Sequence, residues 1–349
     1  MSDCEGPISK NDNAFELASI FIPDGERFFT KLSRYDDVLA DIIKRPGYKA
    51  GNTLKFIVPF LKVYGATNQK IFKYSLENLL LLPSASETLR YIIDIMPAYI
   101  VSTSYEQYLK SICKVVGFPY RNVYCTKLDI DKYKIEAEEA EKLKKLREEI
   151  SKMPIIKIPL GAKSIDDLSS SDREVLERLN EIFWSEIPKM KCGVMLDEVD
   201  PVGGYEKAKA VTEIVERHKA KVKDVIYVGD SIADTDSFRL VREGGGLAIS
   251  FNGNEYAVRE AELAIISSNT LITALIAYVF RKFGKEAVIE LAEGWPDTLN
   301  KYAIHPFYER LRRDLPRVEV VSKSNLPALI EESVLFRKKV RGEKVGALG

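Results

Sequence analysis

The chain has few of the residues from which zinc sites and disulfide frameworks are built. It contains four cysteines and two histidines among 349 residues. The cysteines lie far apart, at Cys4, Cys113, Cys125 and Cys192, and no pair has the Cys-x-x-Cys spacing. Zinc sites and secreted disulfide scaffolds are therefore both disfavoured. A reducing compartment fits this composition, and we expect a cytoplasmic protein.

The chain also lacks an excess of charge and long apolar segments. Lys plus Arg and Asp plus Glu number 52 each, so the formal net charge is zero. A chain without an overall field is not expected to bind nucleic acid by default. The longest apolar run, around residues 271–280, is too short to span a bilayer, and the first residues do not read as a signal peptide. We expect no membrane insertion.

Short strand-like segments recur along the chain, with helical patterns between most of them. They cover residues 98–101, 122–125, 225–228, 246–251 and 263–266. This alternation predicts an α/β protein with a doubly wound, mostly parallel sheet. Ligands of such sheets bind beyond the carboxyl ends of the strands.

Two long segments do not follow the alternation. Residues 15–89 are rich in aromatic side chains on helical patterns, and residues 131–190 begin with a highly charged helical pattern. We interpret them as a helical cap and a second helical insertion. The remaining parts are a core of residues 1–14, 90–130 and 191–270, and a helical C-terminal extension of residues 271–349.

The segment from Val225 to Asp236 carries the strongest chemical signal in the sequence. An apolar strand pattern runs into Gly229 and is followed by Asp230 and Asp234. Carboxylates at a strand end are suitable ligands for Mg²⁺. Aspartates are also common turn and N-cap residues, so the structural alternative stays open.

A second acidic pair lies at the start of the sequence. Asp3 and Glu5 precede the Gly6-Pro7 turn and would share one face of an extended backbone. With Asp230 they could form a cradle of three carboxylates around one magnesium ion.

Four separate motifs follow one another along the sequence. Taken together and in this order, they resemble the motifs of the haloacid dehalogenase superfamily, in particular those of its phosphatases of the phosphoserine phosphatase type. The matching residues are Asp3-Cys4-Glu5, Ser102 at the end of the segment 99–102, Lys207 after Gly203-Gly204, and the loop from Gly229 to Asp234. The resemblance covers about residues 1–270, and it implies a Rossmann-like core with inserted helical caps.

The resemblance implies a magnesium-dependent phosphomonoester hydrolase that acts on a small phosphorylated substrate. Asp3 would attack phosphorus and form an aspartyl-phosphate. Glu5 would act as general acid and then as general base. The metal would be held by Asp3, the backbone carbonyl of Glu5 and Asp230, with Asp234 as a further ligand or as the residue that orients waters and Lys207.

Two further residues would contact the phosphoryl group according to the same resemblance. Ser102 would donate a hydrogen bond to a phosphoryl oxygen, although Thr103 or Ser104 could fill this role, and Lys207 would neutralise phosphate and nucleophile. Without the resemblance, Ser102 could simply end a strand and Lys207 could be a surface lysine.

The sequence departs from the family pattern at two places. Glu5 stands where the family usually has Asp, which lengthens the side chain by one methylene group. Only Met1 and Ser2 precede Asp3, whereas the family places a whole strand there. We expect this first strand to be missing and the natural start to lie upstream.

A second hypothesis belongs to a different class of protein. Similar Glu-Gly-Pro openings belong, by the same resemblance, to archaeal members of uncertain function, some labelled as subunit R of an energy-converting hydrogenase. The chain could then be a weakly active or inactive accessory subunit that binds a protein partner through the cap or the C-terminal helices. The basic segment 336–341 could belong to such an interface or to a frayed helix end.

Overall fold

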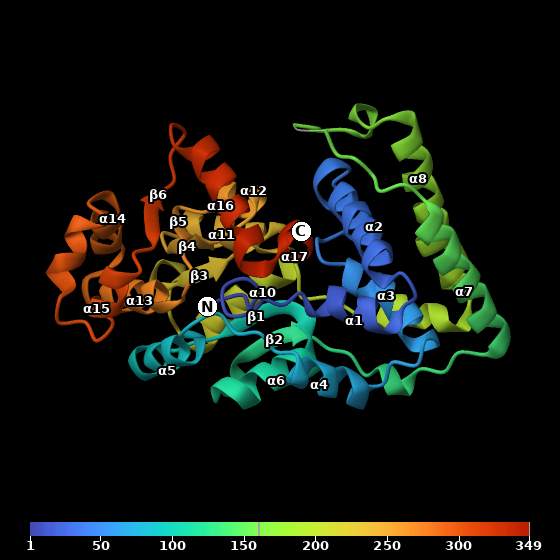
Figure 1. Ribbon diagram of the computed structural model, residues 1–349, viewed down its shortest axis with the longest axis horizontal. Coiled ribbons are helices and arrows are strands. Elements are labelled where there is room, and N and C mark those ends of the chain that lie inside the picture. The colour runs from blue at the N-terminus through green and yellow to red at the C-terminus, as the bar shows by residue number, and fades with distance from the viewer. Residues whose placement is uncertain (160, 349) are drawn as a thin grey trace.

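The computed structural model describes residues 1–159 and 161–348 and shows two lobes (Figure 1). A sheet with helices around it forms one lobe, and a set of long helices forms the other. The C-terminal end lies between the lobes, and the N-terminal end lies within the sheet lobe. The strands are β1 (Ile100–Tyr105), β2 (Val123–Thr126), β3 (Ile226–Gly229), β4 (Leu247–Phe251), β5 (Leu263–Ile266) and β6 (Arg317–Val320).

The helices fall into groups along the chain. Those before β2 are α1 (Asn13–Phe21), α2 (Gly25–Asp37), α3 (Thr53–Val63), α4 (Asn68–Glu77), α5 (Ala85–Ile95) and α6 (Glu106–Val116). Those between β2 and β5 are α7 (Ala137–Lys152), α8 (Ser170–Glu181), α9 (Val194–Glu198), α10 (Tyr205–Arg217), α11 (Thr235–Glu243) and α12 (Glu255–Glu260). The last are α13 (Leu271–Phe283), α14 (Lys285–Glu293), α15 (Tyr308–Arg313), α16 (Leu326–Arg341) and α17 (Glu343–Gly346).

The beginning of the chain completes the sheet. Strand β1 pairs in parallel with β2, and β3, β4 and β5 pair in parallel with one another. Ser2 forms parallel bridges to both Ile100 and Val228, and the Asp3 amide donates to the Val228 carbonyl at 2.8 Å. The expectation of a gap before Asp3 is therefore wrong, because Met1–Asp3 occupies the position between β1 and β3 and pairs with both.

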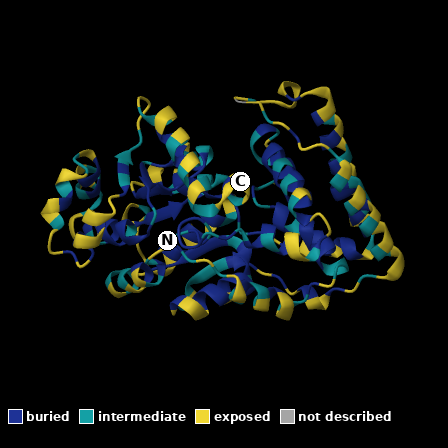
Figure 2. Cartoon of the chain, viewed as in Figure 1, coloured by how far each residue is buried: buried dark blue, intermediate teal, exposed yellow. Residues whose placement is uncertain are grey.

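The mixed α/β architecture predicted from the sequence is confirmed. All five strand-like segments form strands, and β3, β4 and β5 are buried throughout. Alternate residues of one strand enter different apolar clusters: Val228 packs with residues of α6 and α13, and Tyr227 packs with residues of α10 and α11. Helices therefore cover both faces of the sheet, which Figure 2 shows as its buried centre.

One strand was not predicted. Within the C-terminal extension, which was expected to be helical, β6 pairs antiparallel with β5. Its residues Arg-Val-Glu-Val alternate in polarity, but the run is only four residues long, and it lies at the edge of the sheet, where Val318 alone is buried.

The helical lobe has one shared apolar cluster. It combines residues of α1, α2 and α3 with residues of α7 and α8, so the segments interpreted as cap and second insertion pack against each other. Phe56 and Phe183 meet across this contact with ring centroids 4.6 Å apart. Helices α4 and α5 instead pack on α6 and α13 of the sheet lobe.

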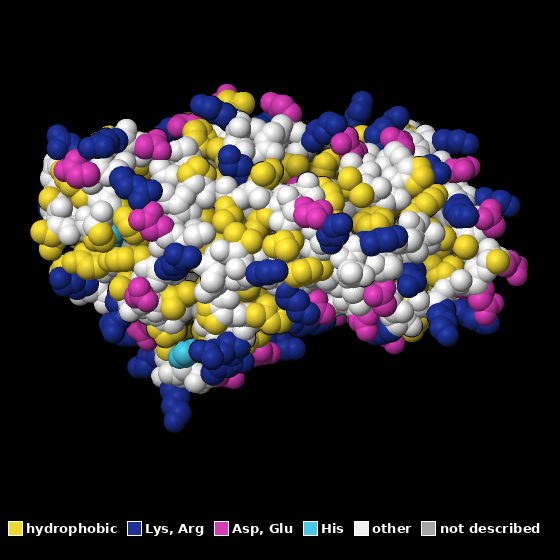
Figure 3. All heavy atoms as spheres, turned by 60° about the horizontal axis from the view of Figure 1, so that its bottom comes forward, with side chains coloured by type: hydrophobic (Ala, Val, Ile, Leu, Met, Phe, Trp, Pro, Cys, Tyr) yellow, Lys and Arg dark blue, Asp and Glu magenta, His cyan; other side chains and the backbone are white. Residues whose placement is uncertain are grey.

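The surface agrees with the balanced composition. Figure 3 shows basic and acidic side chains interspersed over the face it presents. In the described part of the chain, none of the helices combines the length and apolar character needed to cross a bilayer.

Candidate functional site

The buried centre of the site is a lysine between two aspartates. Lys207 lies in the first turn of α10, and its side chain is 0% exposed. Its Nζ donates to Asp3 Oδ2 at 2.6 Å and to Asp234 Oδ1 at 2.7 Å. A buried cation needs such partners, so the three residues form one electrostatic unit.

Asp234 acts as the anchor of the loop after β3. Its Oδ1 also accepts from the Tyr227 hydroxyl at 2.9 Å. Its Oδ2 accepts from the backbone amides of Asp230 and Ser231 at 3.0 and 3.1 Å. Both oxygens of Asp234 are thus engaged, and the residue positions Lys207 and the backbone that carries Asp230.

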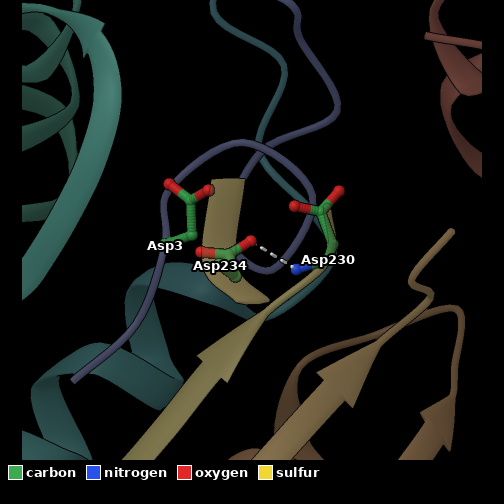
Figure 4. A group of neighbouring side chains, drawn as sticks. All are labelled: Asp3, Asp230 and Asp234. Carbon is green, nitrogen blue, oxygen red and sulfur yellow. Dashed lines mark hydrogen bonds between the residues drawn. The ribbon is translucent and has the colours of Figure 1, made fainter. Parts of the chain in front are cut away.

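Asp230 lies directly beyond the end of β3 and is 1% exposed. Figure 4 shows Asp3 on one side and Asp230 on the other, with Asp234 between them. The turn is tight: a Cβ on Gly6, whose φ is +98°, would lie 2.1 Å from Asp230 Oδ2. The side chain of Asp230 forms ion pairs with Arg337 and, at 3.1 Å, with Arg341.

Ser102 and Glu5 lie around the same space. Ser102 is buried within β1, at the last regular pair before the register with β2 shifts, and its hydroxyl is 3.3 Å from that of Ser104. Between them, Thr103 has a buried hydroxyl with no hydrogen-bond partner among the described residues. Glu5 Oε1 accepts from the Asn13 amide at 2.7 Å, which holds the longer side chain against the start of α1.

A cavity of about 110 Å³ connects these residues. Its floor includes Asp3, Glu5, Ser102 and Asp230 from the sheet lobe. Its roof comes from the helical lobe, with Phe29, Ser33, Asp36 and Asp37 of α2 and with Thr53 and Leu54 of α3. The cavity is small, so it suits a small ligand held between the lobes.

Burial shifts the protonation of two residues at the floor. It raises the pKa of Asp3 to about 6, although the adjacent Lys207 lowers it in part. Burial, together with the charge of Asp12, raises the pKa of Glu5 well above its usual range. Burial alone would lower the pKa of Lys207, but Asp234 and Asp3 raise it above its ordinary value. Asp3 can therefore ionise near neutral pH, while Glu5 favours its protonated form.

The three aspartates are also the candidate metal ligands. One carboxylate oxygen each of Asp3, Asp230 and Asp234 lies within 4.8 Å of the other two. Carboxylates of this kind suit a hard divalent cation such as Mg²⁺. Asp234 already accepts from Lys207, Tyr227 and two amides, whereas among the described residues the carboxylate of Asp3 accepts only from Lys207 and the Cys4 amide. Asp3 and Asp230 are therefore the better ligands, and Arg337 and Arg341 compete for Asp230.

The structure thus brings together all six residues singled out from the sequence: Asp3, Glu5, Ser102, Lys207, Asp230 and Asp234. Sequence reasoning missed Arg337 and Arg341 as members of the site. Their spacing of four residues on one helical face was the available signal, but their distance in sequence from the other motifs hid their connection to Asp230.

Comparison with known proteins shows a likeness to a solved structure. No family model and no curated protein matches the chain. The solved structure of gene product AF1437 from Archaeoglobus fulgidus is similar, with a TM-score of 0.82 and 29% sequence identity. The match covers 100% of this chain and 97% of that one, so the similarity includes the C-terminal extension. That protein's name states no activity.

Proposed function

We propose that the chain is a magnesium-dependent phosphomonoester hydrolase of the haloacid dehalogenase type. The observation that carries this proposal is the buried unit of Lys207 with Asp3 and Asp234, placed next to Asp230 at the ends of adjacent parallel strands. The arrangement of Met1–Asp3 between β1 and β3 supports the same proposal, because it puts Asp3 on the central position of the sheet. A cytoplasmic location remains a prediction.

In the proposed reaction, Asp3 attacks the phosphorus atom of the ester. The bond from Asp3 to phosphorus forms while the bond from phosphorus to the leaving oxygen breaks. Glu5 donates its proton to that oxygen, a role that its raised pKa favours. Glu5 then takes a proton from a water molecule that attacks phosphorus, which releases inorganic phosphate and regenerates Asp3.

The other residues stabilise charge during both steps. Lys207 keeps Asp3 oriented and offsets its charge, and Ser102 or Thr103 donates a hydrogen bond to a phosphoryl oxygen. Magnesium, bound by Asp3 and Asp230, would offset the negative charge of the transferring group. The small cavity between the lobes favours a small phosphorylated metabolite.

The test is phosphate release from a panel of small phosphate monoesters, with and without Mg²⁺. We expect turnover by the natural chain, and its loss in Asp3→Asn. Asp236→Asn is the matched control, because Asp236 lies in the first turn of α11, two residues after Asp234, but is partly exposed and pairs with Arg239 at 3.3 Å. Equal activity of Asp3→Asn and the natural chain would refute the proposal.

An accessory subunit is the second candidate. The ion pairs of Arg337 and Arg341 with Asp230 favour it, because they neutralise the site without any metal. If no ester is hydrolysed and the chain co-purifies with a protein partner, this second candidate becomes the better one.

A further inference from the structure

The C-terminal segment crosses the site from one lobe to the other. Helix α16 packs on α12 and β5, where the Ser333 hydroxyl donates to the Gly253 carbonyl at 2.7 Å. The chain then turns into α17, which lies between the lobes (Figure 1). Lys344 pairs with Glu26 of α2 at 2.6 Å, and Leu348 enters the apolar cluster of the helical lobe. The segment therefore lines one part of the cavity, with Arg337, Arg341 and Leu348.

Two arginines of this segment reach into the site, and they are held differently. Arg341 is fixed by the backbone, because its guanidinium donates to the carbonyls of Lys10 and Asn11 as well as to Asp230. Arg337 depends mainly on Asp230, whose carboxylate and carbonyl it contacts, and it makes one longer contact of 3.5 Å to the Leu348 carbonyl. Its Nε is buried and has no hydrogen-bond partner among the described residues. Arg337 therefore has unused donor capacity.

Each buried cation of the site has a carboxylate partner. Lys207 contacts Asp3 and Asp234, and the side chains of Arg337 and Arg341, which are 3% and 5% exposed, both contact Asp230. A divalent cation that bound Asp230 alone would leave the buried guanidinium of Arg337 without its carboxylate, which is unfavourable. A phosphate dianion bound with the cation would give this guanidinium a new anionic partner.

We propose that Arg337 is a phosphate-binding residue that neutralises Asp230 until a divalent cation and a phosphoryl group bind together. The cation then takes the carboxylate of Asp230, and the guanidinium of Arg337 turns to the phosphoryl oxygens. A guanidinium has several fixed donors that match phosphate oxygens well. This inference rests on the proposed function, since it uses the same positions for cation and phosphoryl group.

The exchange of Arg337 from Asp230 to phosphate makes the binding of the divalent cation and of phosphate cooperative. The cation alone binds weakly because it must displace Arg337, and inorganic phosphate strengthens its binding. By linkage, the cation strengthens phosphate binding by the same factor. Arg341 remains on its backbone carbonyls and keeps the end of α16 in place.

The experiment is isothermal titration calorimetry with Mg²⁺ alone, and then with inorganic phosphate at saturating Mg²⁺. In Arg337→Met we expect Mg²⁺ alone to bind about tenfold more tightly and phosphate about tenfold more weakly, each equivalent to about 1.4 kcal/mol. Lys339→Met on the exposed side of the same helix is the control and should change neither affinity.

Each result has a defined meaning. Unchanged or weaker Mg²⁺ binding by Arg337→Met would overturn the competition for Asp230, and unchanged phosphate binding would overturn the role in phosphate recognition. If Arg337→Met does not fold, Arg337→Lys keeps the charge without the fork of donors. Arg337→Lys should still bind phosphate more weakly than the natural chain does. An unaltered phosphate affinity of this variant would overturn the proposal.

An assay of ester hydrolysis distinguishes the role of Arg337 in binding from the proposed phosphatase activity. Cooperative binding that depends on Arg337, in a chain that hydrolyses no ester, would refute the phosphatase and leave the inference standing. Hydrolysis that requires Asp3, with both affinities unaltered in Arg337→Met, would refute the inference alone.

Discussion

Replacing Lys207 by methionine is the sharpest perturbation of the site. The side chain is 0% exposed, and its Nζ lies 2.6 Å from Asp3 and 2.7 Å from Asp234. Methionine keeps much of the volume but removes the charge, so two buried carboxylates lose their shared partner. The variant tests how much the ion pairs of Lys207 contribute to the stability of the fold and to phosphate release.

The expected loss of unfolding free energy follows from the burial of the ion pairs that Lys207 forms with Asp3 and Asp234. Removing one partner of a buried ion pair costs roughly 3–5 kcal/mol. Because Lys207 has two such partners, we expect the free energy of unfolding to fall by about 5 kcal/mol near pH 8. Phosphate release should fall at least about 100-fold, since Lys207 also stabilises charge in the reaction.

The loss of stability should depend on pH. The pKa of Asp3 is already raised to about 6 with Lys207 present, because burial dominates. Without Lys207, Asp3 would hold its proton to a higher pH. A raised folded-state pKa stabilises the fold at low pH, and this stabilisation is lost as the pH rises through it. The defect of Lys207→Met should therefore be smaller at about pH 5 than at about pH 8.

Urea unfolding followed by circular dichroism measures these differences. Lys209→Met is the matched control on the same helix, because its side chain is 53% exposed and pairs with Glu206 only at 3.9 Å. The double variant with Asp234→Asn should recover part of the loss, since one uncompensated carboxylate is removed. A loss below about 1 kcal/mol near pH 8, the range of exposed pairs, would refute the reasoning.

Three further predictions concern other parts of the site. Glu5→Gln removes the general acid, so hydrolysis of alkyl phosphates should slow by about 100-fold or more, while p-nitrophenyl phosphate, with its better leaving group, slows less. Gly6→Ala would place a Cβ 2.1 Å from Asp230 Oδ2, so urea unfolding should show a larger loss than in Gly47→Ala, where nothing lies within 4 Å. Burial raises the pKa of Asp37 from 3.8 to about 7, so this residue stabilises the fold below about pH 4 and less as the pH rises toward 7. Asp37→Asn should therefore flatten the decline in unfolding free energy between about pH 4 and about pH 7, and an unaltered decline would contradict this.

The local patterns in the sequence predicted most of the sheet. The strands β3, β4 and β5 are buried on both faces, so their apolar runs were unambiguous. The pairing of Met1–Asp3 was not predictable from its own residues. Three residues show no periodicity, and their place depends on the two neighbouring strands, which lie about 100 and 225 positions further along the chain.

The candidate site was predicted to a similar extent. Asp230 follows the end of β3 and Lys207 lies in the first turn of α10, where polarity changes abruptly and the chemistry is visible in the sequence. Arg337 and Arg341 follow no such signal, because arginines near the end of a helix are usually solvated and favourable there. Only the path of α16 across the sheet lobe brings them to Asp230.

The most direct test of the central claim is to look for the aspartyl-phosphate itself. The chain is mixed with Mg²⁺ and a phosphate monoester that it hydrolyses, quenched in acid during turnover, digested, and analysed by mass spectrometry. We predict that the peptide containing Asp3 gains the mass of one phosphoryl group and that Asp3→Asn abolishes this gain. Rapid hydrolysis with an unmodified Asp3 peptide, or a phosphoryl group on another residue, would contradict the account.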